Sequence, residues 1–240
     1  LAIQKWGLHK RVALNILKFS GLNSQGIVAS FMVASAVLSM WVMNTSTAIM
    51  LLPVGISVIK VINDTVNDIT DNQKFNFQLC LLLGIAYAAS VGGIATPIGT
   101  SPNGVLIQFA SNNYDYDIGF ANWISIGLPI TLGLGPIIWI FLTRIIFPVN
   151  FSATQESKDK LNSMLKELGP MSNEEKKVIV VFLITAFFWI FRQLIDNLPG
   201  LALLDDSVIA ISGAVSLFFI KERKNKNKLL QKETIVDLFF

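Results

Sequence analysis

The sequence of 240 residues has little charge for its length. Charged residues make up 15% and hydrophobic residues 52%, whereas a soluble domain carries about 25% charged residues. This composition is typical of an integral membrane protein, so we expect the lipid bilayer as a partner. The net charge of +3 is small and gives no reason to expect nucleic acid as a partner.

Cysteine and histidine occur once each. Cys80 lies within an apolar run, so no disulfide can form within the chain and no cysteine cluster can bind zinc. His9 stands beside two cations, Lys10 and Arg11, and has no neighbouring metal ligand. The sequence also contains no HExxH or GxSxG motif, so we do not expect an enzyme.

Charge is missing altogether from two long stretches. Residues 26–59 and 75–114 contain no Asp, Glu, Lys, Arg or His. Small polar residues interrupt each stretch, first at Ser39–Ala48 and then at Gly92–Gly104. In lipid, a helix break exposes backbone groups that only protein, water or a bound solute can satisfy. Two interrupted hydrophobic segments therefore point to the binding site of a transporter.

The first interruption divides residues 26–62 into two arms. Gly26–Val42 and Ala48–Ile59 are each short for a hydrocarbon core of about 30 Å. We predict a re-entrant helical hairpin whose tip lies inside the membrane. Two full spans joined by an external loop remain the alternative.

The second interruption divides residues 76–111. Six of the thirteen residues in Gly92–Gly104 are Gly or Pro. Phe77–Val91 and Val105–Ala110 flank them as two half-helices, and the second is too short to cross a bilayer. The sequence therefore predicts one discontinuous transmembrane helix.

The polar residues of the two interruptions favour particular ligands. Hydroxyl, amide and carbonyl oxygens suit Na⁺, and half-helices that begin near Thr47 and Gly104 would turn their positive ends towards an anion. A proton-coupled carrier normally keeps a titratable group in the membrane, and neither interruption has one. We therefore expect coupling to sodium. The alternative is that these polar side chains only join helices to one another.

Both interruptions resemble motifs of a known family. The segment Ser39–Pro53 is similar to the Ser-Asn-Thr hairpin of the divalent-anion/sodium symporters, which include di- and tricarboxylate and sulfate transporters. The segment Gly92–Asn103 resembles their Gly-Gly-x-x-Thr-x-x-Gly-Thr-Pro-Pro-Asn element. The resemblance implies an all-α, inverted-repeat, elevator-type transporter, usually a homodimer.

The resemblance also implies how the chain is divided. Residues 1–25 would be the end of a scaffold span and an interfacial helix, and residues 26–148 part of the transport domain, with a last span at 120–148. Residues 149–177 would form a cytoplasmic amphipathic connector and residues 178–240 truncated scaffold spans of the second repeat. The basic clusters then fall on one side of the membrane. Because the chain starts and stops within apolar patterns, we expect an internal fragment.

The binding residues follow from the same resemblance. The sodium site would be formed by Ser39, Asn44 and the backbone at Met43 and Gly99. The substrate carboxylate would contact Asn44, Thr45 and Thr100. Met43 stands where the family usually has Ser, and Ser101 replaces a Pro. We expect Met43 to act through a carbonyl freed by the turn, with its side chain in apolar packing.

The resemblance therefore implies sodium-coupled symport of a divalent anion across the plasma membrane. A C4-dicarboxylate such as succinate, malate or fumarate is the favoured substrate. One alternative is a transporter of sulfate or another inorganic oxyanion. The other, less favoured, is an anion channel in place of a transporter.

Overall fold

The computed structural model describes residues 2–18, 21, 23–195 and 205–219. Their regular structure is helical, with one isolated β-bridge between Asn23 and Ser152. This confirms the predicted all-α class. The chain forms two compact units, one of residues 9–118 and 122–169, the other of residues 1–8, 119–121 and 170–240.

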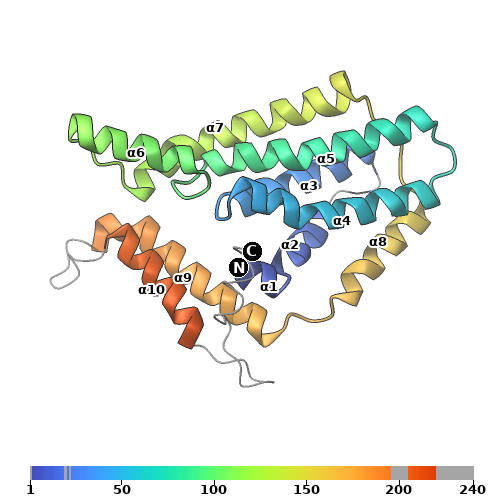
Figure 1. The fold of residues 1–240 in the computed structure, drawn as a ribbon. Helices are drawn as coiled ribbons and strands as arrows, with labels where there is room; N and C mark the ends of the chain where they lie inside the picture. The colour runs from blue at the N-terminus through green and yellow to red at the C-terminus, as the bar shows by residue number, and fades with distance from the viewer. Residues whose placement is uncertain (1, 19–20, 22, 196–204, 220–240) are drawn as a thin grey trace, which may run out of the picture. The chain divides into compact units, whose positions relative to one another are not determined.

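The larger unit is built around a helical hairpin and the helix on which it packs. Helices α3 (Ser24–Ser39) and α4 (Asn44–Thr65) run antiparallel, and α5 (Asp71–Ile94) lies against both (Figure 1). Asn23 caps α3 and a Thr70–Gln73 capping box begins α5. Phe31, Leu51 and Phe77, one from each helix, are fully buried in the shared apolar core.

A short break follows α5. Helix α6 (Ser101–Tyr114) continues beyond this break, and α7 (Phe120–Ile140) returns alongside α5 and ends in a π-helical turn, η1 (Phe141–Ile146) (Figure 1). Pro102 lies in the first turn of α6, where proline needs no hydrogen-bond donor and its fixed φ suits a helix.

The helix bounds correct two expectations from the sequence. Helix α4 has 22 residues, about 33 Å, so it is not the short arm that Ala48–Ile59 predicted. Helix α6 has 14 residues instead of the six of Val105–Ala110. Helix α3, with 16 residues or about 24 Å, is short as expected. Re-entrance into the membrane stays a prediction.

Among the residues that the structure describes, three helices are long and apolar enough to cross a membrane: Asn44–Thr65, Asp71–Ile94 and Phe120–Ile146. Only 11% of the most apolar stretch of the third is buried in the chain, against 56% for the second. The third helix therefore leaves a broad apolar surface for lipid or further protein.

Two amphipathic helices complete the larger unit. They are α2 (Leu8–Leu17) and α8 (Gln155–Glu167). Buried Thr65, at the end of α4, shares a 2.6 Å hydrogen bond with buried Ser157 of α8. Helix α8 lies within residues 149–177, and the role of this segment as a cytoplasmic connector stays a prediction.

The smaller unit contains α1 (Ala2–Lys5), α9 (Asn173–Ile195) and α10 (Asp206–Phe219). Helices α9 and α10 pack together, and the Trp189 indole donates to the Asp206 carbonyl at 3.0 Å. The predicted spans at 178–240 fall partly on residues 196–204 and 220–240, which lie outside the described residues.

Candidate functional site

The turn between α3 and α4 supplies one half of the candidate site. A helix end leaves carbonyl groups without intrahelical partners, and side chains satisfy them here. The Thr96 hydroxyl donates to the Met40 carbonyl, and the Thr47 hydroxyl donates to the Val42 carbonyl at 3.3 Å. Thr96 belongs to the α5–α6 break, so this contact joins the two interruptions that the sequence identified.

The break between α5 and α6 supplies the other half. The buried Asn103 amide donates at 2.8 Å to the carbonyls of both Gly93 and Thr96. The Trp123 indole of α7 donates to the Ile94 carbonyl at 2.9 Å. These bonds hold the irregular backbone in a fixed shape without exposing its carbonyls to lipid.

Glycine allows the two interruptions to touch through their backbones. A Cβ on Gly92 would lie 2.3 Å from the Ala36 carbonyl oxygen of α3. A Cβ on Gly99 would lie 2.5 Å from the Gly93 oxygen and 2.9 Å from the Ser39 oxygen. Any side chain at these positions would push the hairpin away from the break.

The Asn44 side chain lies at the centre of this contact. In the orientation that suits its neighbours, the two N–H groups of Nδ2 face three acceptors: Ser39 Oγ at 2.8 Å, the Ala89 carbonyl at 3.1 Å and the Gly99 carbonyl at 3.2 Å. The amide then reaches the hairpin, α5 and the break together, and the Thr100 hydroxyl lies 3.4 Å from its other end.

A bound cation would require the opposite orientation of the same amide. Asn44 Oδ1 would then face the Ser39 hydroxyl and the Ala89 and Gly99 carbonyls, and these neutral oxygen atoms would be the ligands of the cation.

Two helix N-termini meet at the same place. Helices α4 and α6 begin at Asn44 and Ser101, and neither N-cap residue, Met43 or Thr100, makes a capping side-chain bond. N–H groups in a first helical turn lack intrahelical partners and carry partial positive charge. Thr45 and Ser101 are exposed beside them, so an anion can reach this end of the site.

Comparison with known proteins decides the family. The model of the family described as "Citrate transporter" matches residues 1–233. The chain belongs to the citrate transporter family. This family is one of transporters and not of enzymes, and the resemblance inferred from the two motifs is confirmed.

Similar proteins have a more specific name. The chain is 34% identical over 242 aligned residues to a sodium-dependent dicarboxylate transporter, SdcS, of Staphylococcus saprophyticus, covering 99% of the chain and 47% of that protein. It is 32% identical to SdcS of Staphylococcus aureus strain USA300, with 99% and 46% covered. The chain thus spans about half the length of the curated relatives it matches.

In this member of the citrate transporter family, the structure brings four predicted residues together: Ser39, Asn44, Gly99 and Thr100. Thr45 lies one residue further along α4, exposed at the helix start.

Met43 differs from its prediction in two respects. Its side chain is 59% exposed within the chain, so it does not have the apolar packing we expected. Its carbonyl accepts from the Thr47 N–H at 2.9 Å because the residue is the N-cap of α4, and it is not a free carbonyl at the end of α3. The second lone pair of that carbonyl stays available to a cation.

Sequence reasoning missed two contributors to the site. Gly93 gives the Asn44 amide its space, since a Cβ there would lie 2.3 Å from Asn44 Oδ1. The pair Gly92-Gly93 inside an apolar helix was a usable signal of close approach. The carbonyl of Ala89 had no such signal, because it lies in a regular helical turn.

Proposed function

We propose that the protein takes up a C4-dicarboxylate, such as succinate, malate or fumarate, together with Na⁺ across the plasma membrane. The observation that carries this proposal is the position of the Asn44 amide, which contacts both interruptions at once. The names of the relatives, sodium-dependent dicarboxylate transporters, support the same chemistry.

The sodium site of this proposal consists of neutral oxygen atoms. Ser39 Oγ, Asn44 Oδ1 and the Gly99 carbonyl are its first ligands, and the Met43 and Ala89 carbonyls complete it. Oxygen donors suit a hard cation, and a site without a carboxylate suits a monovalent ion better than Ca²⁺.

The anion would bind at the open side of the same amide. Thr45 and Thr100 offer hydroxyl donors there, Asn44 offers its amide, and the starts of α4 and α6 offer N–H groups. A dianion alone would lose its hydration in this neutral site. A sodium ion about 4 Å away would return about 4 kcal/mol per charge pair at an effective dielectric constant of 20, which couples the two binding events.

Transport itself would follow an elevator-type movement, with the hairpin and the broken helix moving together. Their shared core supports movement as one body: the buried Ser35 hydroxyl of α3 donates to the Ile85 carbonyl of α5 at 2.7 Å, and Gly92 contacts the Ala36 backbone. Re-entrance of the α3–α4 hairpin, an inverted second repeat and a homodimer belong to the same proposal, by resemblance to the symporters.

The test is uptake by the complete gene product in proteoliposomes. Labelled succinate should accumulate above its external concentration under an inward Na⁺ gradient, and should not do so when K⁺ replaces Na⁺. An imposed proton gradient in sodium-free buffer should drive no accumulation. Equal uptake without sodium would contradict sodium coupling, and purely downhill flux would indicate a channel.

Citrate is the second candidate substrate, because the matching family model carries that description. Competition by unlabelled malate, fumarate, citrate and sulfate in the same assay separates the possibilities. Strong competition by malate and fumarate supports the proposal, whereas competition by sulfate or citrate alone assigns another substrate.

A further inference from the structure

The end of α4 away from the candidate site carries a second feature, formed by α2 and α8. The Arg11 guanidinium of α2 donates to the Gly169 and Leu168 carbonyls that follow α8, at 3.0 and 3.2 Å. The apolar sides of both helices contact the core of the larger unit, Leu14 from α2 and Leu165 from α8 among them. The two amphipathic helices are thus fixed to one another and to the hairpin.

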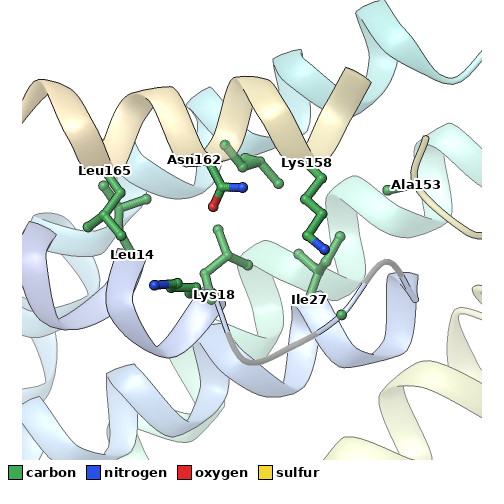
Figure 2. Close-up of a pocket in the computed structure, with 10 residues that line it drawn as sticks. Leu14, Lys18, Ile27, Ala153, Lys158, Asn162 and Leu165 are labelled. Atoms are coloured by element: carbon green, nitrogen blue, oxygen red, sulfur yellow. The ribbon is translucent and has the colours of Figure 1, made fainter. Parts of the chain in front are cut away.

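A shallow pocket opens between these helices. Its floor is apolar, with Leu14, Ile27 and Leu165, and its polar groups are Lys18, Lys158 and Asn162. Figure 2 shows Asn162 extending from α8 towards α2, Lys158 ending beside Ile27, and Lys18 at the other side of the pocket. None of the residues that line the pocket is acidic.

The two lysines leave this pocket with uncompensated positive charge. Within the described ranges, neither ammonium group forms an ion pair. By contrast, Lys160 on the same helix pairs with Glu156 at 2.8 Å and does not line the pocket. Either charge would attract an anion that binds at the pocket.

We propose that this pocket binds the phosphate group of an anionic phospholipid. Amphipathic helices with basic residues lie at the membrane surface, and basic pockets there bind anionic headgroups. Lysine ammonium and an asparagine amide both donate to phosphate oxygens. The pocket has only about 30 Å³ of free volume, too little for an acyl chain. The phosphate therefore lies across the opening while the acyl chains stay in the bilayer.

The site would attach the α2 and α8 ends of the unit to the membrane surface. None of the residues that line the pocket belongs to the candidate site around Asn44. Lipid binding can therefore be measured without sodium or substrate.

The experiment compares four forms of the complete protein: wild type, Lys18→Ala, Lys158→Ala and the double variant. Each is reconstituted in nanodiscs of phosphatidylcholine with increasing phosphatidylglycerol, and retained phosphatidylglycerol is counted by native mass spectrometry. Each lysine near a membrane surface contributes about 1 kcal/mol to binding anionic lipid. We expect affinity to fall about five-fold in each single variant and about thirty-fold in the double variant.

Lys160→Ala is the matched control, because it removes the same charge from the same helix outside the pocket. It should retain phosphatidylglycerol as wild type does, and all forms should melt at similar temperatures in phosphatidylcholine. Equal losses in Lys160→Ala and Lys158→Ala would overturn the site, as would full retention by the double variant. Displacement of the lipid by low-millimolar inorganic phosphate would assign the pocket to a soluble anion and overturn the lipid proposal.

Discussion

Replacing Gly93 by alanine changes the candidate site while leaving the backbone contacts of the fold in place. The new Cβ would lie 2.3 Å from Asn44 Oδ1 and 3.1 Å from its Cγ, and the nearest backbone atom, the Gly99 oxygen, would be at 3.2 Å. The Asn44 amide is the end of a short side chain that can rotate. It therefore moves, and the helices stay where they are.

The cost can be worked out from the sodium ligand that the proposed site would lose. An ordinary carbon–oxygen contact is about 3.5 Å, so the Asn44 amide must move by about 1 Å, which takes it out of reach of an ion held between Ser39 and the Gly99 carbonyl. Losing one neutral oxygen ligand is comparable to losing a hydrogen bond to a charged group, about 1.5 to 3 kcal/mol. A loss near 2 kcal/mol corresponds to about thirty-fold weaker apparent Na⁺ affinity.

The assay is sodium-dependent uptake of succinate at saturating substrate, with Gly104→Ala as the control. Gly104 belongs to the same glycine-rich segment, but a Cβ there meets nothing within 4 Å. The control should keep the wild-type apparent constant for Na⁺. Its free energy of unfolding should rise by about 0.5 to 1 kcal/mol, because Gly lowers the stability of a helix interior.

Two results would refute the reasoning. Wild-type sodium dependence in Gly93→Ala would mean that the Asn44 amide does not bind Na⁺. If Gly93→Ala and Gly104→Ala weakened the apparent affinity for Na⁺ equally, glycine would act in this segment through backbone flexibility and not by leaving room for the Asn44 amide.

Three further substitutions separate structure from binding. Gly92→Ala should lower the melting temperature or abolish folding, since its Cβ would lie 2.3 to 2.7 Å from the Ala36 backbone; normal melting in a thermal scan would contradict that contact. Met43→Ser should change the apparent constant for Na⁺ by no more than a few-fold, because the proposed site uses only the carbonyl of this residue; a tens-fold gain in affinity would make the side chain a missing ligand. Thr45→Ala should mainly raise the apparent substrate constant in uptake assays, and an isolated sodium defect would exclude it from the anion site.

The sequence was sufficient for the class of the fold and for the position of both interruptions. Runs without charge predicted membrane helices. Of the three helices in the described residues that are long and apolar enough to span a membrane, two overlap those runs, and the third, Phe120–Ile146, matches the span expected at 120–148. Ser39, Asn44, Gly99 and Thr100 could be named because two motifs resemble those of a known family. Physical reasoning alone indicated which polar segments form the candidate site, but not which of their residues and atoms would bind the ligands.

Helix ends were predicted less well, because proline and glycine act differently by position. Pro102 was interpreted as a break, yet it opens α6. Pro53 lies inside α4, where a membrane helix tolerates the lost hydrogen bond. The predicted arm Ala48–Ile59 was too short for another reason: the polar residues at 44–47 and the residues from Lys60 to Thr65 were left out of it, and all of them belong to α4. The contact between the interruptions depends on missing Cβ atoms at Gly92, Gly93 and Gly99, which no periodicity reveals.

The central claim is that one amide, that of Asn44, serves both the sodium site and the anion site. Its most direct test is Asn44→Ala in proteoliposomes, with the apparent constants for Na⁺ and succinate measured separately. The proposed site predicts that both constants rise, by about ten-fold or more for Na⁺, while the variant melts within a few degrees of wild type. A variant with wild-type constants for both ligands, or with only one of them changed, would contradict the shared site.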